Sequence, residues 1–165
     1  MRDITASIWR ATRIHVLPEW PGPQEAAGFL VSSLLISHGI RREALALIRV
    51  RGGLLAAPGW TLRQLRPDLD TAEGWLRAAL SGKARRLGAT ILRLTFEAVL
   101  EEAEARGYRV VDTCPGEPGL ETGRTDGIHV IVHRLDSTGG CWLRAPCGPG
   151  CRAAISNVLL DRGST

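Results

Sequence analysis

Short apolar segments typical of buried strands alternate along this chain with longer segments of helical spacing. The expected strands include Arg41–Val50, which ends in a nearly continuous apolar run, Tyr108–Thr113 and Ile128–His133. Stretches of a dozen residues or more separate them, which is the length that a crossover between parallel strands requires. The sequence therefore predicts an α/β fold with a mostly parallel sheet and helices on both faces.

Length and composition favour one soluble domain over residues 1–165. A chain of 165 residues is long enough to bury its own core, and 44% apolar with 23% charged residues is ordinary for a globular protein. No apolar run is long enough to cross a bilayer, and alternating residues rather than an apolar segment follow Met1. We therefore expect no membrane partner and a cytoplasmic location.

The amino-terminal half contains further expected elements. These are a strand at Asp3–Arg10 that extends toward Leu17, a helix at Gln24–His38 ended by Gly39, and an edge strand at Trp60–Leu65. A second helix begins with Asp70 as N-cap, because Glu73 stands at the capping-box spacing, and it ends at Ser81-Gly82. The apolar stripe expected to be buried on it is Leu69, Trp75, Leu76, Ala79 and Leu80.

Thr90–Leu94 fits either a strand or the start of a helix, and Phe96–Ala105 is clearly helical. An irregular loop is expected at Cys114–Asp126.

The last forty residues have the pattern of a ligand site. A strand at Cys141–Ala145 and a glycine-rich loop at Cys147–Cys151 lead into a helix at Arg152–Asp161. Such loops bring backbone N–H groups to a ligand at the carboxyl ends of strands. We therefore predict that the ligand crevice lies in about residues 108–165.

The 21 basic and 17 acidic residues are scattered along the sequence and give a net charge of +4. A nucleic-acid surface would be a stripe on one face, so the sequence alone favours an ordinary solvated surface. Four cysteines lie in the last third, and their spacing suits only half of a zinc site, so we predict no metal and expect reduced, partly buried thiols.

Three segments carry a resemblance to a known family. Leu34-Leu-Ile-Ser-His-Gly-Ile-Arg-Arg-Glu43 resembles Phe-Phe-Leu-Ser-His-x-Ile-Arg-Arg-Asp of the tRNA pseudouridine N-methyltransferases, a branch of the SPOUT α/β-knot methyltransferases. The segment from Leu65 to Leu80 resembles the Ser-Pro-Asp-Glu-Arg segment of that family and the helix after it. The segment from Cys151 to Arg162 is similar to the family's closing Cys-Ile-Thr-Ile-Val-His-Asn-x-Leu-Asp-Arg.

The resemblance implies a C-terminal trefoil knot, a bent S-adenosylmethionine against the knot loops, and a homodimer that methylates RNA. Carried over by position, the cofactor-binding residues would be Val132, Arg134, Leu143, Ala145, Gly148, Gly150, Cys151 and Ile155. His133 and Asp136 would be catalytic, because methyl transfer to nitrogen can need a base. The residues expected to contact substrate are Trp20, Gln24, His38 and Arg41.

Two differences from the family leave other functions open. The family's Gly-Asp-His-x-Gly is Val132-His-Arg-Leu-Asp136 here, and polar residues that precede its first helix fall on Gly22, Pro23 and Gln24. The alternatives are a knot-fold enzyme that acts on a small molecule, with or without methyl transfer, and a non-catalytic RNA-binding dimer.

Overall fold

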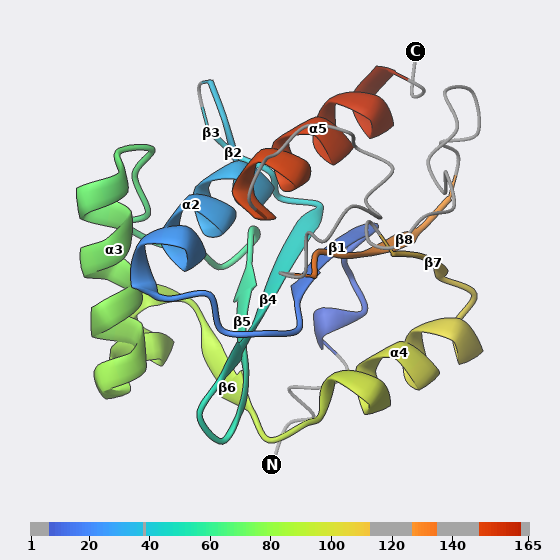
Figure 1. Cartoon of the computed structure of the whole chain (residues 1–165), viewed down its shortest axis with the longest axis horizontal. Helices are drawn as coiled ribbons and strands as arrows, with labels where there is room; N and C mark the ends of the chain where they lie inside the picture. Colours follow the sequence, from blue (N-terminus) through green and yellow to red (C-terminus); the bar gives the residue numbers. More distant parts are fainter. Residues whose placement is uncertain (1–6, 38, 113–126, 135–148, 163–165) are drawn as a thin grey trace.

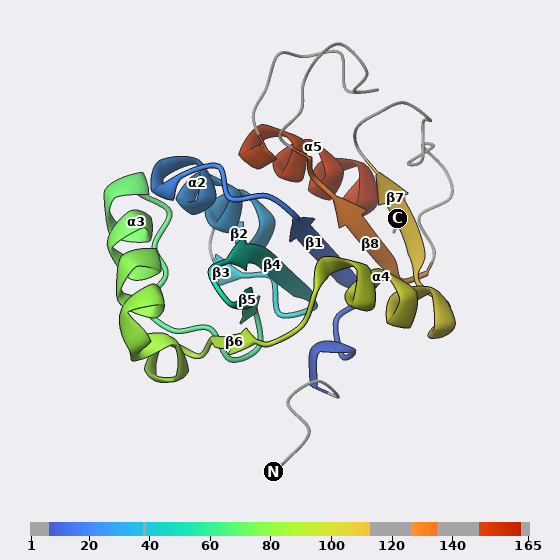
Figure 2. The ribbon, with the colours of Figure 1, turned by 60° about the horizontal axis from the view of Figure 1, so that its bottom comes forward.

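The computed structural model describes residues 7–37, 39–112, 127–134 and 149–162. It has three layers: helices α2, α3 and α5 cover one face of a six-stranded sheet, and α4 covers the other (Figures 1 and 2). The α/β class and the helices on both faces are thereby confirmed. The elements, in chain order, are β1 (Arg13–Leu17), α2 (Pro23–Leu34), β2 (Leu35–Ile36), β3 (Gly39–Ile40), β4 (Ala44–Val50), β5 (Gly53–Pro58), α3 (Leu69–Ala78), the π-helical turn η1 (Ala79–Lys83), the 3-10 helix η2 (Ala84–Leu87), β6 (Thr90–Leu92), α4 (Phe96–Ala105), β7 (Arg109–Asp112), β8 (His129–Val132) and α5 (Pro149–Arg162).

The strand order of the sheet is β6-β5-β4-β1-β8-β7. β1, β4, β7 and β8 are mutually parallel, whereas β5 is antiparallel to both of its neighbours, β4 and β6. The mostly parallel sheet is therefore confirmed. From β1 the chain builds outward through β4, β5 and β6, then moves to the opposite edge and returns to β8. The carboxyl ends of β1 and β8 thus lie side by side where the strand order reverses, the place where α/β proteins bind ligands.

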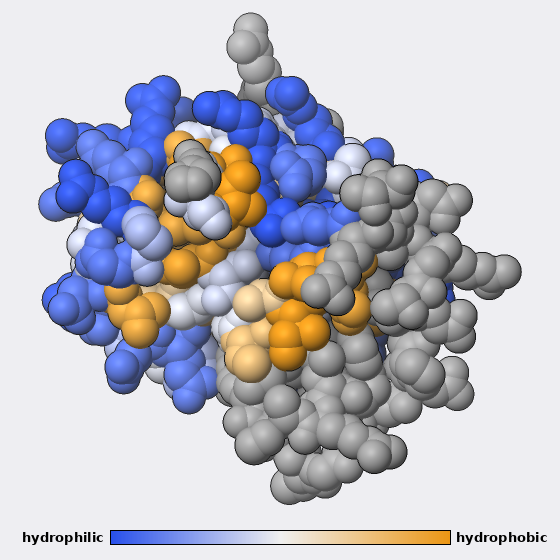
Figure 3. Space-filling model, turned by 90° about the horizontal axis from the view of Figure 1, so that it is seen from above, coloured by the Kyte–Doolittle hydropathy of each residue, from blue (hydrophilic) through white to orange (hydrophobic). Residues whose placement is uncertain are grey.

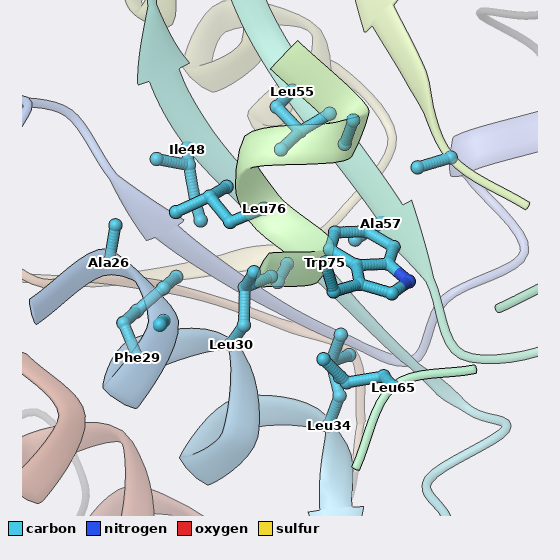
Figure 4. Packing of buried hydrophobic residues seen from close by; sticks show 14 of the residues in the cluster. Ala26, Phe29, Leu30, Leu34, Ile48, Leu55, Ala57, Leu65, Trp75 and Leu76 are labelled. Atoms are coloured by element: carbon cyan, nitrogen blue, oxygen red, sulfur yellow. The ribbon is translucent and has the colours of Figure 1, made fainter. Parts of the chain in front are cut away.

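Alternating residues of the central strands separate two apolar cores. Ala46 and Ile48 of β4 pack with α2 and α3, while Leu45 and Leu47 pack on the side of α4. Figure 4 shows Trp75 of α3 among residues of α2 and the sheet, and its indole Nε1 donates a hydrogen bond to the Arg63 carbonyl at 2.8 Å. Apolar side chains therefore cover both faces of the central strands over most of their length, as expected of parallel strands packed between helices.

The strand predicted at Asp3–Arg10 is wrong over its described residues. Ser7 and Ile8 are helical, Trp9 and Arg10 form a turn, and the strand begins only at Arg13. Ile8 and Ala11 are both buried in the core on the side of α4. Residues three apart share one side of a helical turn but point to opposite faces of a strand, so burial of both favours the turn.

The edge strand predicted at Trp60–Leu65 is also wrong. The strand is Gly53–Pro58, which forms a tight hairpin with β4, and residues 60–65 form turns and irregular structure. Gly52 has φ of 86° at this hairpin, a backbone conformation that favours glycine. Arg51 and Gly52 therefore form the turn between β4 and β5, and Gly53 is the first residue of β5.

The first helix ends at Leu34 rather than at His38, because Leu35 is extended and starts the β2–β3 hairpin. Gly39 lies in that hairpin and is no helix cap. His38 lies outside the described residues.

Helix α3 starts two residues earlier than predicted. Its N-cap is Asp68, whose side chain accepts a hydrogen bond from the Thr71 N–H at 2.8 Å, so Asp70 lies within the first turn. Of the predicted apolar stripe, Trp75, Leu76 and Ala79 are buried, but Leu69 and Leu80 are 47% and 38% exposed.

Most predictions for the carboxyl-terminal half are confirmed where the chain is described. The loop predicted at Cys147–Cys151 is wrong over its described residues, because helix α5 already begins at Pro149, a residue type that suits the first position of a helix. Phe96–Ala105 is helical with the predicted ends, and the ambiguous Thr90–Leu94 contains a strand. β7 and β8 lie within Tyr108–Thr113 and Ile128–His133. The strand Cys141–Ala145, the loop Cys114–Asp126 and the threading of a knot depend on residues 113–126 and 135–148, which lie outside the described residues.

Helices α2 and α5 meet at two glycines. A Cβ placed on Gly150 would lie 3.0 Å from the carbonyl carbon of Gly28 and 3.1 Å from its oxygen. Backbone atoms cannot move aside as a side chain can, so Gly150→Ala should force α5 away from α2. We expect it to lower the free energy of unfolding by about 1–3 kcal/mol.

Gly74→Ala is the matched control, because a Cβ at Gly74 in α3 meets nothing within 4 Å. Alanine stabilises an open helical position, so this variant should gain about 0.5–1 kcal/mol. Urea unfolding of both variants measures the difference. Equal effects of the two substitutions would show that the contact of Gly28 with Gly150 does not limit helix packing.

Candidate functional site

Two polar side chains of the central strand β1 point toward α2 and α5. Ile14 and Val16 lie in the core on the side of α4, so Arg13 and His15, which alternate with them, face the opposite layer. His133 follows directly after β8 and continues the pairing with β1, since its backbone N–H donates to the Val16 carbonyl at 2.8 Å. The β1–β8 junction therefore holds two histidines inside the protein.

The two imidazoles are in direct contact and fully buried. His15 Nδ1 lies 3.1 Å from His133 Nε2, and the rings stack with centroids 5.3 Å apart. Both side chains are 0% exposed, and the Phe29 ring of α2 packs edge-on against both. Water is thus excluded from this contact.

Asn157 of α5 fixes the hydrogen positions in this pair. Its Oδ1 accepts from Arg13 at 2.8 Å, and its Nδ2 donates to the carbonyls of Ser32 and Ser33, so neither end of the amide can be exchanged. His15 Nε2 lies 3.0 Å from the same Oδ1 and must carry a proton. His15 Nδ1 is then an acceptor, and His133 Nε2 donates to it. The basic nitrogen of a neutral His133 is therefore Nδ1.

His15 stays uncharged in the folded protein at neutral pH. Burial lowers its pKa to about 3, and the positive charges of Arg13 and Arg41 act in the same direction, while the hydrogen bond with Asn157 acts in the opposite one. The uncharged His15 ring holds His133 in place by accepting its hydrogen bond, and it does not become charged near pH 7.

Asp161 receives two guanidinium groups at the end of the network. Arg41 binds it in a bidentate manner at 3.0 and 2.9 Å, and Arg13 donates to it at 3.0 Å. The two arginine side chains are only 11% and 13% exposed. Partial burial opposes the charged carboxylate, but the hydrogen bonds from Arg41 and Arg13 outweigh it and keep the pKa of Asp161 below its usual value. This cluster ties α5 to β1 and to the segment after the β2–β3 hairpin.

A second polar pair lies at the carboxyl edge of the sheet. Arg134 follows β8, Asp112 ends β7, and the Arg134 Nε donates to an Asp112 oxygen at 2.8 Å. The guanidinium also lies 5.7 Å from the centre of the Phe96 ring. The Arg134 and Asp112 side chains are 38% and 32% exposed, so a ligand at this edge could reach both charges.

The predicted cofactor residues do not share one environment. Val132 is buried in the core on the side of α4, Gly150 packs on α2, and Arg134 pairs with Asp112. Ile155 is half-buried, and Cys151 is exposed, contrary to the expected partly buried thiol. The remaining predicted cofactor residues, Leu143, Ala145 and Gly148, and the predicted catalytic Asp136 lie outside the described residues.

The predicted substrate residues also have different surroundings. Arg41 belongs to the buried network, whereas Trp20 is 41% exposed and Gln24 is exposed in the first turn of α2. The structure thus brings Arg41 and His133 into one connected set of polar side chains and leaves Trp20 and Gln24 at the surface.

Sequence reasoning missed His15, Arg13, Asn157 and Asp161 as members of this set. The available signal was the alternation of Arg13 and His15 with apolar residues in a segment that had to be a central strand. A polar side chain on a buried strand needs a partner. Among the described residues, the helix side chains that hydrogen-bond to Arg13 or His15 are Asn157 and Asp161, and both lie in the resembling segment from Cys151 to Arg162.

Within the ranges that the structure describes, no group of three or more His, Cys, Asp and Glu side chains could hold a metal ion. No helix in these ranges is long and apolar enough to span a membrane. No protein-family model matches the chain, and a search of curated proteins found no match.

The buried His15 makes stability depend on pH in a defined window. Its pKa is lower in the folded protein than in the unfolded chain, so between about pH 6.5 and 3 the unfolded chain binds a proton that the folded protein does not. Acidification should therefore destabilise the protein, by about 2 kcal/mol between pH 7 and 5.

His15→Gln removes this titration while it keeps a polar side chain. Urea unfolding at pH 5, 6 and 7 should show a clearly smaller pH dependence in the variant, because only His15 is lost from the titrating groups. A wild-type His15 ring that titrates above pH 5 in NMR spectra of the folded protein would contradict the assignment.

Proposed function

We propose that this chain is an S-adenosylmethionine-dependent methyltransferase of the SPOUT type that acts on a pseudouridine-like or other heterocyclic nitrogen in RNA. The observation that carries the proposal is the bidentate pair of Arg41 and Asp161. It joins the resembling segment Leu34–Glu43 to the resembling segment Cys151–Arg162, and the third segment contributes α3, which packs on α2. Three stretches that are far apart in the sequence thus lie on one face of the sheet. Helices α2 and α5 cover the β1–β8 junction, and α3 packs farther along the sheet, beside residues of β4 and β5.

The charges at the carboxyl edge suit the amino-acid end of S-adenosylmethionine. That end carries a carboxylate, which a guanidinium such as Arg134 binds, and an ammonium group, which a carboxylate such as Asp112 binds. Both side chains are partly exposed and stand beside the strand-order reversal. The bound cofactor would supply an electrophilic methyl group, and the residues of the chain would hold cofactor and substrate in line.

The hydrogen-bond network limits how His133 acts in this proposal. Its Nε2 is occupied by His15, so only Nδ1 can accept a proton from a substrate. Because the side chain is 0% exposed, a substrate atom can reach Nδ1 only when the residues that cover it move aside. His15 and Asn157 would then act as positioning residues that fix the ring and its tautomer.

Isothermal titration with S-adenosylmethionine tests the cofactor directly. We expect measurable binding heat for the wild type and an affinity at least tenfold lower for Arg134→Gln, because one hydrogen-bonded charge pair contributes about 1.5–3 kcal/mol. Arg109→Gln is the matched control, since Arg109 is an exposed arginine on the neighbouring edge strand β7.

Absence of heat and of a thermal shift at millimolar S-adenosylmethionine would refute the methyltransferase proposal. The alternatives from the sequence would then stand: an enzyme that acts on a small molecule, or a non-catalytic RNA-binding dimer. If Arg134→Gln binds S-adenosylmethionine as tightly as the wild type, the cofactor proposal stands, but its binding site does not include the Asp112–Arg134 pair.

A further inference from the structure

The fold collects basic residues that are scattered in the sequence at one edge of the sheet. Between Ala44 and Phe96 the only acidic residues are Asp68, Asp70 and Glu73, against nine basic ones. Seven of these nine, all exposed, are here named the basic edge: Arg49, Arg51, Arg63, Lys83, Arg85, Arg86 and Arg93. The other two, Arg66 and Arg77, lie near Asp68 and pair with Glu73, respectively.

Backbone contacts place the two halves of the basic edge at the two ends of β6. The Arg63 N–H donates to the Leu87 carbonyl at 3.0 Å, which brings Arg63 beside the 3-10 helix that carries Arg85 and Arg86. At the other end of β6, the turn that carries Arg51 packs on the chain at Arg93, since a Cβ on Gly53 would lie 3.3 Å from the Arg93 Cα. Figures 1 and 2 show β6 at the outer edge of the sheet, next to the turn between β4 and β5.

The basic edge is a line of charge that is not neutralised within the described part of the chain. None of its seven members has a carboxylate within ion-pair distance there, whereas Arg13, Arg41, Arg77, Arg106 and Arg134 each have one. The three residues of β6 span roughly 10 Å, and basic residues lie beyond both ends. A linear array of this kind fits successive phosphates of a nucleic-acid strand.

The residue types favour phosphates over a membrane surface. Six of the seven are arginine, whose planar guanidinium binds phosphate oxygens in pairs. Surface-bound membrane proteins use a basic face together with a broad apolar face that inserts among lipids. In and beside the basic edge the exposed large apolar residues are two separate ones, Ile91 in β6 and Leu80 in the turn that carries Lys83, which is no broad apolar face. The larger apolar areas that Figure 3 shows lie over another part of the molecule, on the side of α5 and the β2–β3 hairpin.

We propose that the basic edge binds the phosphate backbone of RNA. The inference deepens the proposed function, because it locates the surface that would hold the RNA substrate, but the binding itself needs neither cofactor nor catalysis. β6 is parallel to β1 and β8, so Arg93 and Arg51 lie at the same end of the sheet as His133 and Arg134. An RNA bound there would extend along the carboxyl ends of the strands toward the candidate site.

Fluorescence anisotropy with a labelled, unfractionated tRNA tests the surface across a salt series. The wild type should bind with a steep negative slope of log affinity against log salt concentration, because each phosphate contact releases counterions. Arg85→Gln/Arg86→Gln should weaken binding on the order of tenfold and reduce the slope by about 1–2. Arg49→Gln/Arg51→Gln should act in the same way from the other end of β6.

The matched control is Arg106→Gln/Arg109→Gln, which removes the same charge near the opposite edge of the sheet. It should retain wild-type affinity and slope, and thermal melts of all variants show whether they remain folded. Equal losses of tRNA affinity in the control and in the basic-edge variants would show that only the net charge of the protein matters, and would overturn the proposal. Wild-type affinity for tRNA that does not depend on salt would also overturn the proposal, as would basic-edge variants that bind tRNA like the wild type. The positive charges would then serve to protect the edge strand β6 from pairing with other chains.

Two further measurements separate the possible failures. Vesicles of phosphatidylserine and phosphatidylcholine that bind the wild type while tRNA does not would assign the surface to a membrane and refute the RNA proposal. RNA binding without any S-adenosylmethionine heat would refute the methyltransferase proposal alone, and cofactor binding without RNA binding would refute the basic edge alone.

Discussion

The side-chain amide of Asn157 is the contact on which the arrangement of α5 depends. One amide accepts from Arg13 in β1, lies 3.0 Å from His15, and donates to two backbone carbonyls at the end of α2. Each of these partners is polar and mostly buried, so each would cost free energy if it had no partner. The amide satisfies them together only when α5 has one rotation and one height above the sheet.

This constraint explains why the helix layer can be so closely packed. A strongly apolar interface tolerates small rotations, whereas a hydrogen-bond network with fixed donors and acceptors does not. The close approach of Gly150 to Gly28 therefore agrees with the register set by Asn157 and Asp161. The same network orients the His133 ring through His15. A change in the position of α5 would therefore also change the orientation of the ring at the end of β8.

The sequence predicted the elements whose signals are local. The helix prediction for Phe96–Ala105 was confirmed, because apolar residues repeat along it at helical spacing and Thr95 caps its first turn. The strand prediction that contains β8 was also confirmed, because a short, mostly apolar run is typical of a buried strand. The mistakes came where tertiary contacts decide. Gly52-Gly53 could end a strand or join two, and only the partner strand β6 shows that Gly53–Pro58 is paired on both sides. The candidate site was predicted in part, since Arg41 and His133 were named, but His15 and Asn157 are separated by 142 positions and no spacing rule connects them.

The basic edge was invisible in the sequence for the same reason, and it bears on which substrate the candidate site would serve. Its residues come from four stretches that β5, β6 and the 3-10 helix bring together, and the long segments between them include strand β5 and helix α3. From β6 to β8 there are four strand spacings, or about 19 Å. Arg49 and Arg51, in β4 and the turn after it, are nearer, at two strand spacings or about 10 Å. A free nucleoside held at the end of β8 could not reach the part of the basic edge at β6, whereas an RNA of several nucleotides could bind at both places at once. The second contact raises affinity without any change at the reacting atoms, which is the advantage that joined contacts provide. Within the described residues these cations have no carboxylate at ion-pair distance, and a small-molecule substrate would not need so long a line of positive charge. This charge distribution is the observation that supports our proposal of RNA over the small-molecule alternative.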